Sequence, residues 1–99
     1  MEAVRWYRLA ADQGHDYAQY SLGWSYEHGD GVAVDLVEAV RWYRLAADQG
    51  CDDAQYSLGD CYANGRGVAV DLVEAVRWYR LAADQGCALA RQALRLLEQ

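Results

Sequence analysis

The side chains with the clearest potential for metal binding or nucleophilic chemistry are two histidines and three cysteines. His15, Cys51 and Cys87 follow one another at intervals of 36 residues, which is also the interval at which the whole sequence repeats. Residues in matching places of successive repeats are held one repeat apart. They cannot all come within the 2.0–2.3 Å or so that zinc ligands require. His28 stands alone, and we expect no metal site.

Glycine-rich loops are the second feature that could carry chemistry. The loops at 29–31 and 65–67 lack the Lys-Ser/Thr pair of a phosphate-binding loop and the spaced acids of a calcium loop, so we interpret them as turns. No Ser, Cys or Asp is accompanied by a plausible base at a defined spacing. We therefore expect neither an enzyme nor a cofactor.

The element that positions every side chain is an internal repeat. The segment Glu38–Gly50 occurs letter for letter at Glu2–Gly14 and again at Glu74–Gly86. An offset of 36 residues superimposes residues 2–37 on residues 38–73, and only seven positions differ. Self-similarity at this period is typical of a solenoid, in which each unit buries its apolar face against its neighbours.

Each repeat predicts two helices, which we call helix A and helix B. Helix B spans Asp35–Gly50: Asp35 can cap it, Glu38 can reach back to the cap, and Gly50 can end it in a left-handed conformation. Helix A spans 16–28 and 52–64, with apolar residues at four-residue intervals facing helix B. A glycine in the middle of helix A, at 23 and 59, predicts a close approach of helix B.

These helices follow in the order B-A-B-A-B-A, so we predict an all-α solenoid of about six helices in a single domain. It divides into a half repeat (1–14), two repeats (15–50 and 51–86) and a C-terminal capping helix (87–99). In the last helix Arg95 replaces the expected glycine, as suits an end where no helix B follows.

The composition indicates which kinds of partner and which cellular compartment to expect. The net charge of −6 argues against nucleic acid, because binding phosphates needs a basic surface. No apolar run reaches the roughly 18 residues of a membrane-spanning helix, and the N-terminus does not resemble a signal peptide. An odd number of cysteines favours free thiols in a reducing, cytoplasm-like compartment. The absence of Ile, Phe, Thr, Lys and Pro suits a GC-rich gene or a consensus-built, engineered array.

The repeat resembles the SEL-one-like repeat (SLR) family, a relative of the tetratricopeptide repeats. The matching residues are Ala18, Leu22, Gly23, Tyr26, Gly29, Gly31, Val32, Asp35, Ala39, Trp42, Tyr43, Ala46, Ala47 and Gly50, and the match continues from Ala54 to Gly86. The resemblance implies a right-handed superhelix of antiparallel helix pairs that acts as an adaptor without catalytic residues. Some secreted members tie their repeats with cysteine pairs, but the partner positions of Cys51 and Cys87 are here Ala47 and Ala83.

The positions that differ between repeats indicate where a partner binds. On a helical wheel positions 17, 24, 27 and 28 of helix A lie away from the core stripe, on the face that lines the concave groove of related solenoids. The candidate partner-binding residues are Tyr17, Tyr20, Trp24, Glu27, His28, Asp53, Tyr56, Asp60 and Asn64. Trp24 is the strongest candidate anchor, since Trp6, Trp42 and Trp78 belong to the repeated unit whereas Trp24 is matched by an aspartate. The acidic residues favour a protein or peptide with basic side chains.

Two alternatives remain open at this point. Trp24 can instead pack on the N-terminal helix, which would give it a structural role. The chain can also be an idealised scaffold without a ligand that forms a homodimer through the first helix, which lacks the helix A it would normally pair with. Val4, Tyr7 and Ala11 would lie in that contact.

Overall fold

A computed structural model describes residues 2–98, so Met1 and Gln99, the ends of the first and last predicted segments, lie outside it. Within this range there are six α-helices and no strands. The helices are α1 (Glu2–Asp12), α2 (Asp16–His28), α3 (Leu36–Asp48), α4 (Asp52–Asn64), α5 (Leu72–Asp84) and α6 (Ala88–Leu97). The odd-numbered helices are the predicted B helices and the even-numbered ones the predicted A helices.

Local capping explains where the B helices begin. The Asp35 carboxylate accepts a hydrogen bond from the backbone N–H of Glu38 at 3.1 Å, which satisfies one of the free donors of the first turn. The reciprocal bond predicted for Glu38 does not form. Its carboxylate pairs with Arg41 at 3.0 Å, and the Asp35 N–H donates to the carbonyl of Tyr26 at 2.9 Å. The loop thus ties the start of helix B to the end of helix A.

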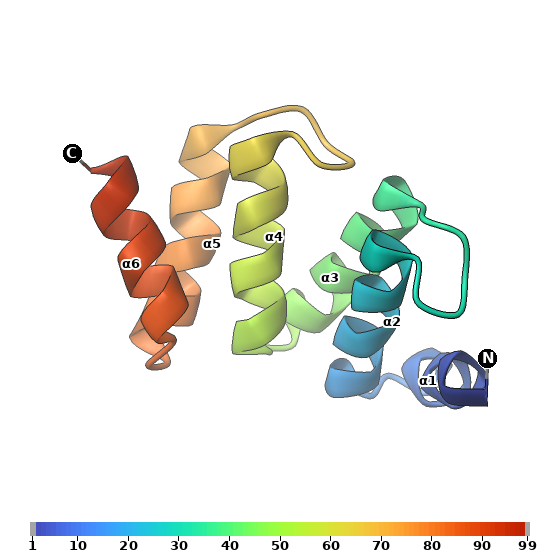
Figure 1. The fold of residues 1–99 in the computed structure, drawn as a ribbon. Helices are drawn as coiled ribbons and strands as arrows, with labels where there is room; N and C mark the ends of the chain where they lie inside the picture. The colour runs from blue at the N-terminus through green and yellow to red at the C-terminus, as the bar shows by residue number, and fades with distance from the viewer. Residues whose placement is uncertain (1, 99) are drawn as a thin grey trace.

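The helices stack in sequence order into an elongated array of 43 × 24 × 17 Å. Each helix packs mainly against its neighbours along the chain, from α1 at one end to α6 at the other (Figure 1). This arrangement confirms the predicted all-α solenoid.

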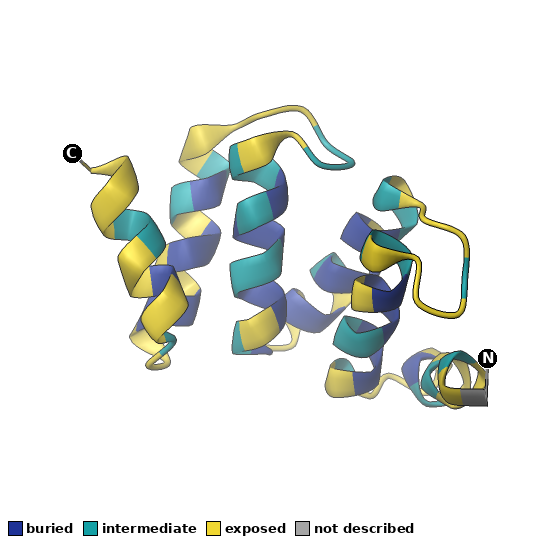
Figure 2. Ribbon diagram, in the orientation of Figure 1, coloured by how far each residue is buried: buried dark blue, intermediate teal, exposed yellow. Residues whose placement is uncertain are grey.

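The buried residues follow the faces where neighbouring helices meet (Figure 2). Leu22 and Tyr43 are completely buried there, and the repeated tryptophans Trp42 and Trp78 are only 4% and 3% exposed. Trp6, the third copy, is 66% exposed because no described helix covers it. The same side chain is therefore core in two repeats and surface in the half repeat.

The A and B helices approach each other closely at the mid-helix glycines. A Cβ atom at Gly23 would lie 2.8 Å from the ring of Tyr43, and one at Gly59 would lie 2.7 Å from the ring of Tyr79. Such distances are too short for carbon atoms, so only glycine fits without displacing a buried ring. Arg95 stands at the matching place in α6, where no described helix packs against it.

Two buried glutamines join successive repeats, and the sequence analysis did not identify them. The Gln19 side chain donates to the carbonyl of Ala11 at 3.2 Å and accepts from Gln49 at 2.6 Å. The Gln55 side chain does the same with Ala47 at 3.2 Å and Gln85 at 2.9 Å. These bonds satisfy polar groups inside the stack, where an unpaired amide would be costly.

Candidate partner-binding surface

The aromatic and histidine side chains that distinguish repeat one lie at the surface of α2. Tyr17 is 62% exposed, Trp24 is 41% exposed and the His28 side chain is 45% exposed. Leu22, on the opposite face of the same helix, is completely buried. Position 24 is thus reachable by a partner while the core stripe is not.

Tyr17 and Trp24, together with Tyr20, contribute to a pocket of about 290 Å³ between α1 and α2. Its walls include Tyr7 from α1, Tyr17, Tyr20 and Trp24 from α2, and Asp30 from the following loop. The rings of Tyr17 and Tyr20 are 5.7 Å apart, a separation typical of interacting aromatic pairs. Trp24 forms one wall, and its ring lies 4.2 Å from that of His28. Tyr7 and Asp30 were not predicted as members of this group.

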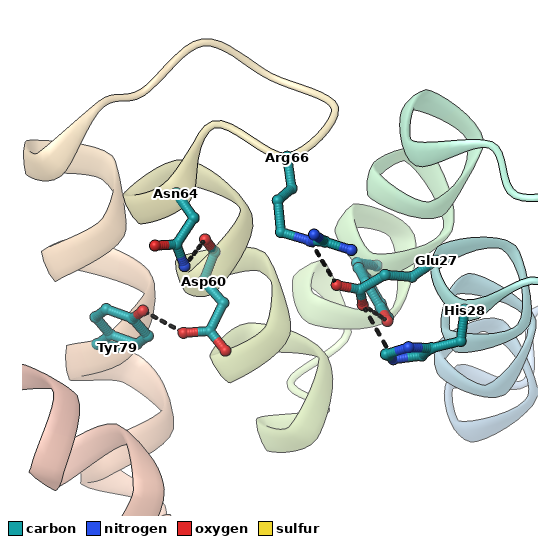
Figure 3. A network of polar contacts seen from close by, with 7 residues as sticks. Glu27, His28, Asp60, Asn64, Arg66 and Tyr79 are labelled. Carbon is teal, nitrogen blue, oxygen red and sulfur yellow. Dashed lines mark hydrogen bonds and ion pairs between the residues drawn. The ribbon is translucent and has the colours of Figure 1, made fainter.

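Glu27, by contrast, is largely used inside the protein. Its carboxylate accepts a hydrogen bond from the Tyr43 hydroxyl at 2.6 Å and another from Arg66 Nε at 3.0 Å, and its side chain is only 15% exposed. Figure 3 shows Arg66 reaching from the loop after α4 to the end of α2, with His28 on the other side of the same carboxylate at 3.8 Å. The structure therefore corrects the prediction: Glu27 links two repeats rather than facing a partner.

Asp60 has a similar internal role in repeat two. Its carboxylate accepts a hydrogen bond from the Tyr79 hydroxyl, while the Asn64 side-chain amide donates to its backbone carbonyl at 3.0 Å (Figure 3). Asp60 is half-buried and Asn64 exposed. Of these two predicted contacts, only Asn64 is exposed.

The carboxylate that accepts a hydrogen bond from the helix-B tyrosine comes from a different position of helix A in each repeat. Glu27 is matched by Ala63 and Asp60 is matched by Trp24, so the acid has moved by three residues, close to one helical turn. In each repeat it still reaches the tyrosine of the following helix B. Because Glu27 supplies the acceptor in repeat one, position 24 is free to carry a tryptophan. The sequence signal for this exchange is a pair of differences three residues apart. Repeat one has Trp24 where repeat two has an acid, and it has the acid Glu27 where repeat two has Ala63.

Burial and the neighbouring carboxylates keep these tyrosines protonated. Desolvation, followed by the hydrogen bond to Glu27, raises the pKa of Tyr43 far above its usual value. Desolvation and the bond to Asp60 raise the pKa of Tyr79 in the same way. Both phenols therefore remain hydrogen-bond donors throughout the physiological range.

A second hollow of about 290 Å³ lies between α4 and α6. Tyr56, Asp60, Asn64 and Tyr79 line one side, and Leu89 of α6 faces them. The predicted residues thus divide between this hollow and the aromatic pocket between α1 and α2. Asp53 is exposed, and its charge is close enough to Tyr20 to contribute to that residue's raised pKa, whose largest cause is burial.

The predicted self-association residues do not share one exposed face. Ala11 is only 2% exposed because it packs with Ala18 and Leu22 of α2. Val4 and Tyr7 are half-buried, and Tyr7 also lines the aromatic pocket. Ala11 is therefore unavailable to a second chain, which corrects that part of the prediction.

The cysteines and acids do not gather into a metal site in the part of the chain that the structure describes. No three His, Cys, Asp or Glu side chains in residues 3–98 lie close enough together to hold one ion. Cys51 and Cys61 are buried free thiols, and Cys87 is a half-buried one. None of the six helices in the described part of the chain has both the length and the apolar character needed to cross a bilayer.

Comparison with known proteins gives a consistent result. The sequence profile described as Sel1 repeat matches residues 1–15, 16–51 and 52–87. A Sel1 repeat protein from Oxalobacter formigenes is 46% identical, with a TM-score of 0.90 over 93% of this chain and 69% of its own. No curated protein sequence matches the chain significantly.

Two further solved structures are similar. A protective antigen of uropathogenic Escherichia coli with an SLR fold is 49% identical and has a TM-score of 0.87 over 88% of this chain, which corresponds to 19% of the antigen. Cysteine-rich protein B of Helicobacter pylori is 26% identical, with a TM-score of 0.86 over 92% of this chain and 68% of its own.

Proposed function

Because the chain belongs to the Sel1 repeat family, whose members mediate protein–protein interactions, we propose that it is a non-catalytic interaction module that binds a partner segment around Trp24. The binding surface is the concave face of the A helices, which takes a peptide or a partner helix, and Tyr17 and Tyr20 flank the anchor. The partner is a protein or peptide, with basic residues favoured by the net charge of −6.

The exposure of Trp24 is the observation that supports this proposal. Trp24 is 41% exposed on a helix whose other face is core, so a large part of its ring is open to a partner. The repeat does not require it, because the matching position in α4 carries Asp60. Exposed aromatic residues beside a hollow are favoured anchors at protein interfaces.

Substitution of the two exposed tryptophans tests the proposal. Peptides would be selected on the wild-type protein from a random displayed library, and their affinities for Trp24→Ala and Trp6→Ala would be measured by fluorescence polarisation. We expect Trp24→Ala to cost at least about 2 kcal/mol of binding, roughly thirtyfold in affinity. Trp6→Ala, which removes the same side chain from a different face, is the matched control. Equal affinities for wild type and Trp24→Ala would refute the anchor.

A second candidate function is a ligand-free scaffold that self-associates through α1. The exposure of Trp6, at 66% against 4% for Trp42, supports it, since an uncovered tryptophan favours contact with another chain. Head-to-tail stacking in the register of the repeats is disfavoured because Arg95 would meet Tyr7 where a glycine is needed. A dimer would therefore join two α1 helices. Sedimentation from low to high micromolar concentration tests this, and a monomer throughout excludes it.

A further inference from the structure

The site formed by Glu27 and Tyr43 of repeat one and Arg66 of repeat two shows what can occupy the space in front of a helix-B tyrosine. There Tyr43 and Arg66 both donate to the Glu27 carboxylate, at 2.6 Å and 3.0 Å, so the side chain of the preceding helix A fills the site. One repeat earlier, the residues matching Tyr43 and Arg66 are Tyr7 and Asp30. Both line the aromatic pocket. That pocket is therefore the counterpart of the Glu27 site, without a described helix to fill it.

The charged residue at the pocket has the opposite sign to its match at the Glu27 site, since Asp30 stands where that site has Arg66. Glu27 of repeat one is held by the cationic Arg66 of repeat two, but a carboxylate at the pocket would meet the anionic Asp30. Asp30 is exposed and forms no ion pair with any residue between 2 and 98. The negative charge of Asp53 also acts on Tyr20, another pocket residue. The pocket thus repels an acidic side chain and attracts a basic one.

The aromatic rings that line the pocket are also suited to a basic side chain. Aromatic faces attract Lys and Arg cations electrostatically, at exposed sites as well as buried ones. The arginines that stack on rings within the described chain cover other aromatic residues, namely Tyr26, Trp42, Tyr62 and Trp78. In residues 2–98 no cation of the protein stacks on the rings of Tyr7, Tyr17, Tyr20 or Trp24.

We infer that the pocket between α1 and α2 receives a lysine or arginine side chain of the bound partner segment, with Asp30 pairing its charge and the rings of Tyr20 and Trp24 packing on its stem and head. This inference rests on the proposed function and specifies its chemistry. The occupant is a different protein rather than a second copy of this chain. In a head-to-tail stack, a Cβ at position 95 would come within about 2.8 Å of the Tyr7 ring, as the matching glycine contacts show.

Small cationic probes test the pocket directly. The side-chain indole N–H resonance of Trp24, assigned with Trp24→Phe, would be followed by NMR during titration with Nα-acetyl-arginine amide and Nα-acetyl-lysine amide. Nα-acetyl-norleucine amide has a similar stem without charge and serves as the neutral control. We expect saturable shifts with dissociation constants on the order of 1 mM for the cations. Binding of all three probes with equal affinity would overturn the inference.

Asp30 variants complete the test. Asp30→Asn should weaken cation binding up to about fivefold, as expected for an exposed ion pair, and Asp30→Arg, which restores the residue of repeat two, should abolish it. Asp84→Asn removes an equal charge from the exposed face of α5 and should leave binding unchanged. Unchanged binding by Asp30→Arg, or no saturable response to either cation, contradicts the inference. A concentration-dependent Trp24 shift without probe would instead identify a second copy as the occupant.

The library experiment separates the two proposals. Selected peptides that depend on Trp24 but carry no enriched Lys or Arg, and that bind Asp30→Asn normally, would refute the cation site and leave the interaction module intact. Failure to select any Trp24-dependent peptide would refute the proposed function itself. The NMR titration does not rely on that selection, so each proposal can fail on its own.

Discussion

Tyr43 donates a 2.6 Å hydrogen bond from α3 to Glu27 of α2, although the matching tyrosine of the next repeat donates to an acid one turn earlier on its helix. The requirement conserved between the repeats is thus an acceptor for the buried phenol, and the position of that acceptor is adjustable. This freedom lets nearly identical repeats present different surfaces, because the position not used for the acceptor is open to another side chain.

The carboxylate exchange predicts that a destabilised variant can be rescued. Glu27→Ala should cost about 1–3 kcal/mol of unfolding free energy, since it leaves the Tyr43 hydroxyl without its acceptor. Adding Trp24→Asp places an acid where repeat two has one and should recover most of the loss. Urea denaturation measures both effects. Glu38→Ala, which removes a half-exposed pair with Arg41, is the control and should cost less than about 1 kcal/mol. A double variant less stable than Glu27→Ala alone would contradict the exchange.

The mid-helix position should prefer glycine in α4 but a residue with a side chain in α6. Alanine at Gly59 would gain about 1 kcal/mol of helix propensity, but its Cβ would collide with the Tyr79 ring, so we expect a net loss of about 1–3 kcal/mol. Arg95→Gly should also destabilise, by up to about 1 kcal/mol, because no described helix packs there and only propensity matters. Thermal unfolding compares the two variants. A stabilising Gly59→Ala would show that the close approach is absent in solution.

Stability should fall at alkaline pH. Burial raises the pKa of the Cys61 thiol from 9.0 to about 12, so in this range the unfolded chain holds fewer protons than the folded one. The contribution of Cys61 is complete below pH 9 and is lost as the pH rises towards 12, by at most about 1.4 kcal/mol per pH unit. Urea denaturation across this range should show a shallower fall for Cys61→Ser, the residue that repeat one carries as buried Ser25. An unchanged slope would contradict this assignment.

Thiol reactivity should follow burial. Cys87 is half-buried, whereas Cys51 and Cys61 are buried and burial raises the pKa of both. Since the thiolate is the reactive form, a disulfide reagent at pH 8 should modify one thiol per native chain quickly and all three after unfolding. Cys87→Ser should remove the fast phase. Rapid modification of three thiols in the native protein would show that the core opens readily.

Much of this fold could be predicted from the sequence. The helix ends follow from short-range signals such as the Asp35 cap and the positive φ of Gly50, which involve residues a few positions apart. The repeat period shows which helices are equivalent, and the mid-helix Gly23 shows where two of them meet. These features depend on local geometry, so each leaves a pattern that can be recognised without coordinates.

The candidate site was predictable only in part. Trp24 and Tyr17 are exposed on the predicted face, but Glu27 and Ala11, assigned to the same surfaces from their position in the repeat, are used inside the molecule. Helical periodicity shows towards which side a residue points, but it cannot show whether a tyrosine 16 positions later will reach its carboxylate. The Glu27–Arg66 pair spans 39 positions and joins two repeats.

The sequence by itself determined the number of helices, their limits and their order, because caps, glycines and periodicity act within a turn or two of the chain. Only the tertiary structure decided which acid is bonded to a buried tyrosine, which tryptophan is covered and which rings surround an open pocket. Those outcomes depend on how separate helices approach one another in space. The same Glu-Ala-Val-Arg-Trp-Tyr segment buries Trp42 but exposes Trp6, since burial is a property of the neighbours and not of the segment.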